Sequence, residues 1–206
     1  MTHVQDDAES NICKACAEEE YDSACTLALK SFGPEILSFL SARLHSPADG
    51  TEAFSMFAED LWKALPGFAF RCSIRGWMYT LARNAANRFV SAPHRRPDRN
   101  LAVTGRDSLS ALIDQVRSTT KIYQKTDTKD RVRALREQLA DEDQMLLILH
   151  VDRALPWREI AMVMHDDGTD LCGDALARET ARLRKRFERV KGELKEMALR
   201  EGLLKR

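Results

Sequence analysis

The chain has 206 residues, and its 32 lysines and arginines balance its 32 aspartates and glutamates, so net charge favours no class of partner. Its apolar content is ordinary for a globular protein and excludes disorder as the default state. The lack of a long apolar run or signal-peptide layout predicts a cytoplasmic protein with no membrane association, and five scattered cysteines are typical of reduced thiols in that compartment.

Charge is distributed unevenly along the chain. Residues 1–70 carry mostly carboxylates, residues 71–99 are almost purely basic, and residues 178–206 lean basic. Such asymmetry is expected when one face meets a protein and others meet a polyanion. The helical periodicity described below predicts an all-α chain, and the segments of different composition divide it into two small helical domains. The predicted segments are an acidic N-terminal arm at 1–20, a first domain at 21–92, a linker at 93–129 and a second domain at 130–206.

The N-terminal arm is expected to be frayed or weakly helical. Its Cys13 and Cys16 form a C-x-x-C pair, but metal or redox use would need further donors or a low-pKa thiolate, so free thiols on a helix are the favoured interpretation. Tyr21–Leu44 is predicted to be a helix or a helix pair, because Gly33-Pro34 marks either a break or a new first turn. Residues 45–50 have the composition of a loop.

The next predicted helix, Thr51–Leu65, has apolar side chains at regular helical spacing. Its other side carries Glu52, Glu59 and Asp60 beside Ser55. These acids form either a docking surface for a protein or an ordinary solvated face, and the pattern favours neither.

A loop at Pro66–Ser73 and a helix to about Phe89 follow, with Ser73 as the expected helix cap. The outer face of this segment combines rings, cations and amides, which suit stacking on bases and contact with phosphates. The candidate residues are Phe68, Arg71, Arg75, Trp77, Tyr79, Arg83, Asn84, Asn87 and Arg88. The alternative is a core helix with a solvated basic face, in which Trp77 is buried.

The linker contains Pro93 and Pro97, which prevent helix continuation, and one short helix is expected near Leu109–Val116. In the second domain, helical patterns run from Asp130 to about Asp152, with Asp141 as the expected cap between two of them. Pro156 then opens a helix at 157–164, and His165–Gly173 is a turn. A cation site at Asp166, Asp167, Asp170 and Asp174 is disfavoured, since the spacing does not fit a calcium loop.

The last predicted helix runs from Asp174, as its cap, to about Glu201. Its first half fits a recognition helix, with Arg178, Glu179 and Arg182 suited to base edges and Arg184, Lys185 and Arg186 suited to phosphates. Ion pairing between Glu179 and Arg182 along the helix surface is the alternative explanation of these charges.

Two blocks of this sequence resemble the extracytoplasmic-function (ECF) group of bacterial RNA polymerase sigma factors. The first contains Leu61-Trp62-Lys63-Ala64-Leu65-Pro66-Gly67-Phe68 and Trp77-Met78-Tyr79-Thr80-Leu81-Ala82-Arg83-Asn84. The second contains Leu155-Pro156-Trp157-Arg158-Glu159-Ile160-Ala161, which is similar to the first helix of the sigma helix-turn-helix. The blocks cover roughly residues 23–90 and 130–200, in the family's order.

The resemblance implies an initiation subunit that binds core RNA polymerase and promoter DNA, needs no cofactor or metal, and can have an anti-sigma factor as a further partner. The helix at 51–65 would contact the polymerase through Glu52, Ser55, Glu59 and Asp60, although Ser55-Met56 stands where the family carries Gln-Glu. The face at 68–88 would hold bases flipped from the minus-ten strand, and the helix from 174 would read the minus-thirty-five duplex.

A stand-alone helix-turn-helix regulator that binds duplex DNA without polymerase is the alternative function. An enzyme is not predicted, because the sequence carries no zinc-protease motif, glycine-rich phosphate loop or nucleophile–base signature.

Overall fold

A computed structural model of the chain describes residues 2–91, 111–116, 127–165 and 171–204. Every regular element within these ranges is an α-helix or a single 3-10 or π turn, which confirms the all-α prediction. The chain divides into two compact units, Met1–Ile122 and Tyr123–Arg206. Among the described helices, none has the length and apolar character needed to cross a membrane.

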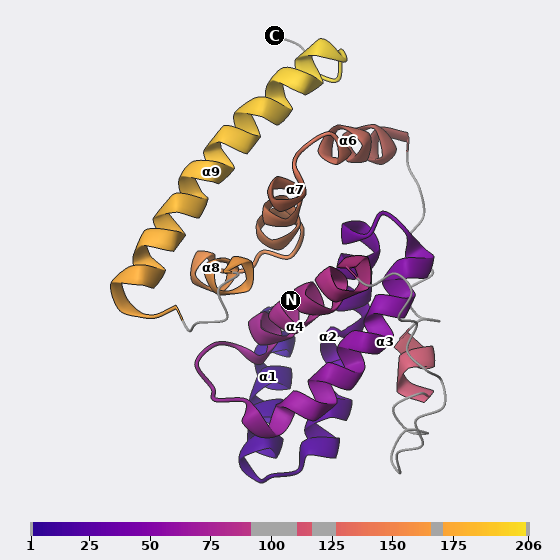
Figure 1. Ribbon diagram of the computed structural model, residues 1–206, viewed down its shortest axis with the longest axis vertical. Coiled ribbons are helices and arrows are strands. Elements are labelled where there is room, and N and C mark those ends of the chain that lie inside the picture. Colours follow the sequence, from indigo (N-terminus) through magenta and orange to yellow (C-terminus); the bar gives the residue numbers. More distant parts are fainter. Residues whose placement is uncertain (1, 92–110, 117–126, 166–170, 205–206) are drawn as a thin grey trace. The chain divides into compact units, whose positions relative to one another are not determined.

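The first unit is built around α1 (Thr2–Ala17), α2 (Tyr21–Arg43), α3 (Pro47–Ala64) and α4 (Ile74–Ser91), which form a bundle (Figure 1). Helix α2 packs against each of the other three. Apolar residues at helical spacing on facing sides meet in the core, where Phe32, Phe39, Phe54 and Phe57 are fully buried.

Helix α1 corrects the prediction of a frayed acidic arm. Ile12, Ala15 and Cys16 are buried on its inner side, where α1 packs against α2. Their spacing of three and four residues makes a short apolar stripe. The polar residues that surround this stripe conceal it in the sequence.

Helix α2 passes through Gly33-Pro34 without a break. Proline removes one backbone hydrogen bond, but Phe32 and Ile36 on either side are buried and hold the helix against the bundle. Helix α3 begins earlier than predicted, at Pro47, because the Ser46 hydroxyl accepts a hydrogen bond from the Asp49 N–H at 3.2 Å. The prediction of a loop at 45–50 is therefore wrong beyond Ser46.

Two glycines of the first unit permit close packing. A Cβ on Gly50 would lie 2.6 Å from the Cα of Ser41, so only glycine allows α2 and α3 to approach so closely there. A Cβ on Gly33 would lie 3.1 Å from Cγ2 of Val116. Residues 111–116 are helical, and their Ile113 and Val116 are buried.

The predicted linker is therefore only partly a connection. The short helix expected near Leu109–Val116 is seen over its described part, 111–116, and belongs to the first unit. Helix α6 already begins at Asp127, within the predicted linker. The remainder of the linker, at 93–110 and 117–126, lies outside the described residues.

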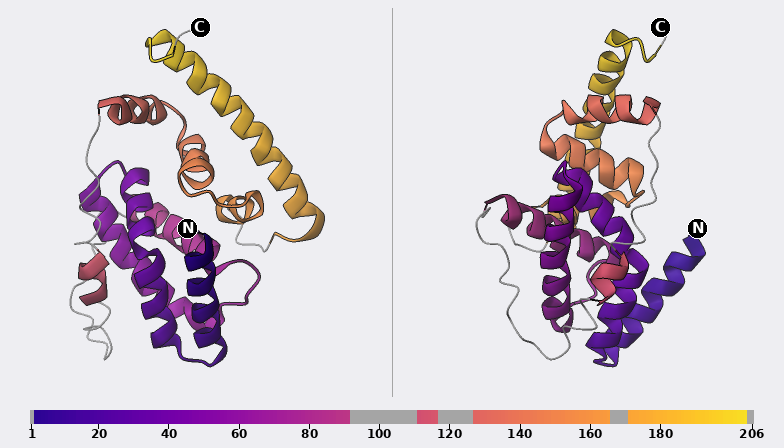
Figure 2. Two further views of the ribbon diagram at one scale, coloured as in Figure 1. Left: turned by 180° about the vertical axis from the view of Figure 1, so that it is seen from behind. Right: turned by 90° about the vertical axis from the view of Figure 1, so that its right-hand side faces the viewer.

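The second unit contains α6 (Asp127–Glu137), α7 (Asp141–Leu147) with a π turn at Ile148–Asp152, α8 (Trp157–Met164) and α9 (Gly173–Arg200). The long helix α9 contacts α6, α7 and α8, and Figure 2 shows these three helices following one another beside it. Leu183, Phe187 and Val190 of α9 are buried, and so are Leu146 of α7, Leu149 of the π turn and Ile160 of α8.

The predicted caps of this unit are wrong by one or two residues. The N-cap of α7 is Ala140 and that of α9 is Cys172, so Asp141 and Asp174 lie in the first turns. Carboxylates there still face the positive end of the helix dipole. Most of the predicted turn, with Asp166, Asp167 and Asp170, lies outside the described residues.

Candidate nucleic-acid interface

Three rings meet where the loop after α3 joins α4. Phe68 lies between Phe70 and Trp77, with ring centroids 4.8 Å from each. Phe68 is buried and Trp77 half-buried, whereas Phe70 is 51% exposed. The loop has a 3-10 turn at Leu65–Gly67, and Phe70 has a φ of +55°, a strained conformation for a bulky residue. The exposed ring of Phe70 is therefore packed on the buried ring of Phe68.

The start of α4, next to these rings, is fixed by two caps. The Ser73 hydroxyl accepts a hydrogen bond from the Gly76 N–H at 2.9 Å, as the sequence predicted. Glu9 of α1 accepts a second from the Ile74 N–H, 2.6 Å from its Oε1. A carboxylate at a helix N-terminus is stabilised by the helix dipole. Helix α1 therefore helps to position the first turn of α4.

Glu35 of α2 binds two residues that the sequence assigned to the minus-ten face. Nε and Nη2 of Arg75 donate to its two carboxylate oxygens at 2.7 and 3.2 Å. The hydroxyl of Tyr79 donates to Oε1 of Glu35 at 3.2 Å, and the Arg75 guanidinium lies 6.0 Å from the centre of the Tyr79 ring. Because Tyr79 is fully buried and Arg75 is held by two bonds, both stabilise the bundle instead of facing a ligand.

The prediction that nine residues at 68–88 face outward together is wrong for several of them. Arg83 is only 5% exposed, and Phe68 and Tyr79 are also in the interior. The helix turns these positions toward α2 and α3, which sequence periodicity did not resolve because the segment carries polar residues on most sides. Arg71, Asn84 and Arg88 are exposed, and Trp77 and Asn87 are half-buried.

The four residues predicted to contact polymerase lie on α3 and are all half-buried. Glu59 is 3.7 Å from Nζ of Lys63, and Asp60 forms an ion pair with Arg88 of α4. The Ser55 hydroxyl donates to the Thr51 carbonyl. Glu52, Ser55 and Glu59 follow one another at three and four residues, so they share one face of the helix.

In the second unit, Glu179 and Arg182 bind each other. Nε and Nη2 of Arg182 donate to the Glu179 carboxylate at 2.8 and 2.6 Å, which is the alternative that the sequence left open. The hydrogen bond from Arg182 lowers the pKa of Glu179, and the same bond raises the pKa of Arg182. The pair remains at the surface beside the exposed Arg178.

Arg186 does not face a phosphate. It is bonded to Asp143 and Glu142 of α7, and Arg189 contacts Asp143 at 3.3 Å. Asp143 is a buried carboxylate, which needs a cation to offset its desolvation. Arg186 therefore joins α7 to α9, and its assignment to DNA is wrong.

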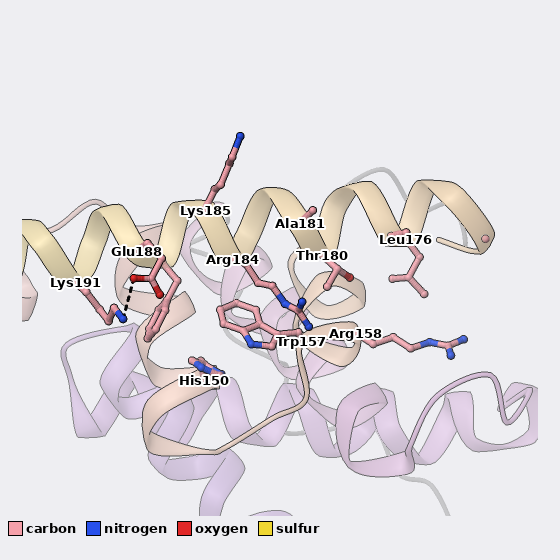
Figure 3. Close-up of a pocket in the computed structure, with 13 residues that line it drawn as sticks. His150, Trp157, Arg158, Leu176, Thr180, Ala181, Arg184, Lys185, Glu188 and Lys191 are labelled. Carbon is pink, nitrogen blue, oxygen red and sulfur yellow. Dashed lines mark ion pairs between the residues drawn. The ribbon is translucent and has the colours of Figure 1, made fainter.

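A groove of about 1120 Å³ runs between α8, the π turn and α9. Its floor includes His150, Trp157 and Phe187, with His150 centred 4.1 Å from Trp157 and 4.7 Å from Phe187. Arg184 lies 5.9 Å from the centre of the Trp157 ring. Arg158, Arg184 and Lys185 all line the groove, and in Figure 3 the Lys185 side chain points in a different direction from that of Arg184. The sequence predicted Arg184 and Lys185 as equivalent phosphate contacts, and their different directions were not foreseen.

The rings of this groove come from three elements: His150 from the π turn, Trp157 from α8 and Phe187 from α9. Trp157 was noted only for its place in the helix-turn-helix phrase, and His150 gave no signal at all. The one feature of the sequence that could have indicated this groove is the tryptophan beside an arginine in the first turn of the short helix α8.

Three cysteines of the first unit, Cys13, Cys16 and Cys25, carry no sign of reactivity. Cys16 and Cys25 are buried and Cys13 half-buried. Burial, with the nearby Asp22 and Cys16, raises the pKa of Cys25 to about 12, and burial likewise raises the pKa of Cys13 and Cys16. A raised pKa leaves little thiolate at neutral pH. Within the described residues, no three His, Cys, Asp or Glu side chains are grouped so as to hold a metal ion.

Comparison of the chain with protein-family models, curated proteins and solved structures finds no match.

Proposed function

We propose that the chain is a transcription initiation subunit of the ECF sigma type, acting in the cytoplasm. It binds core RNA polymerase through the acidic face of α3, reads a minus-thirty-five element with α9, and holds the unpaired minus-ten strand at the loop before α4. A protein of this type can also bind an anti-sigma factor. The order of the two sequence blocks supports this proposal, and so does the occurrence of α8 and α9 in succession in the second unit.

The observation that carries the proposal is the exposure of Phe70. This residue is 51% exposed, and its backbone has a φ of +55°, a left-handed conformation that costs a bulky residue about 1–3 kcal/mol and is concentrated at binding sites. Arg71 follows it on the surface, and Phe68 and Trp77 support it from below. Rings and cations in alternation are what single-stranded DNA requires.

The surface for the unpaired strand is smaller than the sequence implied. It contains Phe70, Arg71 and Trp77 at the loop, with Asn84 and Asn87 farther along α4. Stacking contributes ~1–3 kcal/mol per base, and flipping a base out costs a few kcal/mol. The rings of Phe70 and Trp77 can therefore offset the cost of flipping out about one base. Contacts with core polymerase would supply the remaining free energy needed to open the promoter.

A stand-alone regulator is the second candidate, and one observation favours it. Glu35 binds Arg75 and Tyr79 and so removes two groups that a melting surface would use. In the second unit, Arg178 and Lys185 remain exposed on α9 for duplex DNA. In this alternative only the second unit contacts DNA.

Transcription in vitro with core polymerase and genomic DNA separates the two functions. The sigma proposal predicts new start sites that require both this protein and core enzyme, with permanganate-reactive thymines upstream of each start. Promoter binding at equal strength without core enzyme, and no open complex with it, would establish the regulator instead.

A pair of matched variants locates the melting surface. Phe70→Ser should reduce open-complex formation at least fivefold, which corresponds to the loss of one stacking contact of ~1 kcal/mol. Leu27→Ser removes another exposed apolar side chain from the same unit and should leave initiation unchanged. Equal effects of the two substitutions would refute the assignment of Phe70.

A further inference from the structure

The groove between α8 and α9 is unused by the proposed function. A recognition helix contacts the duplex through its outer side, where Arg178 is exposed and does not line the groove. The groove lies along a different flank of α9, whose lining includes Thr180, Arg184 and Lys191. Lys185 also lines the groove, and in Figure 3 its side chain points in a different direction from that of Arg184.

The floor of the groove is a three-ring cluster. Trp157 and Phe187 are centred 5.5 Å apart at an angle of 72°, and His150 lies against both. Among the described residues, Nδ1 of His150 is buried with no hydrogen-bond partner, so the ring is held there by packing. Trp157 and His150 are half-buried, and part of each faces the groove.

Cations extend along the groove above these rings. Arg184 lies over Trp157, and Nζ of Lys191 lies 5.3 Å from the centre of Phe187. Arg158 is exposed at the other end, beyond Trp157 (Figure 3). The one acid in the lining, Glu188, is paired with Lys191 at 2.9 Å. The lining therefore carries an excess of positive charge and suits an anionic ligand.

The spacing of these cations distinguishes among anionic ligands. Arg184 and Lys191 are seven residues apart, which is about 10 Å along an α-helix. A mononucleotide concentrates its charge at one end and would meet only one of them. An acidic peptide would meet the cations but would make no use of flat ring surfaces. A single nucleic-acid strand alternates charged phosphates with flat bases, and bases stack on aromatic rings and on arginine guanidinium planes.

We propose that this groove binds a short stretch of single-stranded nucleic acid, with a base stacked at Trp157 and Arg184 and phosphates at Arg158, Arg184 and Lys191. This site is separate from the duplex-reading side of α9 and from the loop before α4. It would hold a strand even if the protein has no role in initiation.

The test measures fluorescence anisotropy of a labelled eight-residue oligothymidylate with the full-length protein. A Phe70→Ser background removes the ring through which the first unit would bind the same probe. Three phosphate contacts predict a slope of about −2 for the logarithm of affinity against the logarithm of salt concentration, since each contributes about −0.7 in single strands. Arg184→Gln should reduce the slope by about 0.7 and weaken binding at least fivefold.

Lys195→Gln is the matched control, because it removes one positive charge from an exposed position of the same helix that does not line the groove. It should leave oligonucleotide binding unchanged. An abasic strand of equal length and charge should bind at least fivefold more weakly than oligothymidylate, through the loss of stacking worth ~1–3 kcal/mol per base. Both substitutions are at exposed positions, so neither is expected to prevent folding.

Three results would overturn the proposal. The first is the absence of oligonucleotide binding in the Phe70→Ser background. The second is an equal loss of binding with Lys195→Gln and Arg184→Gln, which would indicate nonspecific attraction. The third is displacement of the strand by an equally charged polyglutamate peptide at the same concentration, which would assign the groove to an acidic protein.

Discussion

Arg75 should stabilise the first unit instead of contacting DNA, and the substitution Arg75→Met tests this. Its guanidinium is bonded twice to Glu35, and the two side chains are only 15% and 19% exposed. Removing one partner of a fully buried pair costs ~3–5 kcal/mol, because the other charge is left without compensation. Water still reaches this pair, so we expect a loss of about 2–3 kcal/mol in the free energy of unfolding.

The double variant Arg75→Met/Glu35→Gln separates the pair from its surroundings. Glutamine removes the unpaired charge and still offers an oxygen to the Tyr79 hydroxyl. The double variant should therefore lose less free energy of unfolding than the two single variants lose together, and the difference is a coupling energy of about 1–2 kcal/mol.

Urea unfolding followed by tryptophan fluorescence measures these energies. In a Trp157→Phe background the signal comes from Trp62 and Trp77, both in the first unit, so the second unit does not contribute. An unchanged unfolding midpoint for Arg75→Met, together with a loss of open-complex formation, would refute the reasoning and return Arg75 to the DNA-binding surface.

Three further predictions concern the cysteines, the second unit and α1. At pH 8, iodoacetamide should modify Cys172 and spare Cys25 until urea is added, as measured by mass spectrometry. Burial raises the pKa of Cys25 from 9.0 to about 12. The stability that the buried thiol contributes is therefore complete below pH 9 and is lost as the pH rises toward 12. Arg186→Ala should destabilise the second unit by about 2 kcal/mol in urea unfolding. Arg178→Ala should change the free energy of unfolding by no more than about 0.5 kcal/mol and should weaken duplex binding. The reverse pattern would contradict the assignment of Arg186 to α7. Glu9→Ala should reduce stability by about 1 kcal/mol through loss of the cap on α4, and a normal unfolding midpoint would show that the cap is dispensable.

Regular apolar spacing allowed most of the helices to be predicted. The core of α3 and the inner side of α9 follow the expected stripes, and Ser73 caps α4 as predicted. These features depend on neighbours three or four residues apart, which the sequence displays directly. Short stripes are harder to recognise for the same reason: among the residues of α1 whose burial is described, the stripe consists of Ile12, Ala15 and Cys16, with polar residues around it.

The candidate interface was predicted less well than the helices. Arg71, Arg75, Arg83 and Arg88 look alike in sequence, yet their surroundings differ. Arg75 is bound to Glu35, Arg83 is buried, and Arg88 is exposed but paired with Asp60. An arginine takes whichever partner the packed chain brings near it, and here the partners are 28 and 40 residues away. No local pattern contains that information.

The sequence by itself determined that this protein is built of helices, where most of them run, and which stripe of each is apolar, because those properties follow from the periodicity of a single helix. Only the tertiary structure decided which charged and aromatic side chains remain available. The acids Glu35 and Asp143 of neighbouring helices bind Arg75 and Arg186, and the rings of His150, Trp157 and Phe187 meet from three elements. Such pairings depend on which helix faces lie opposite each other, and that is a property of the packed bundle.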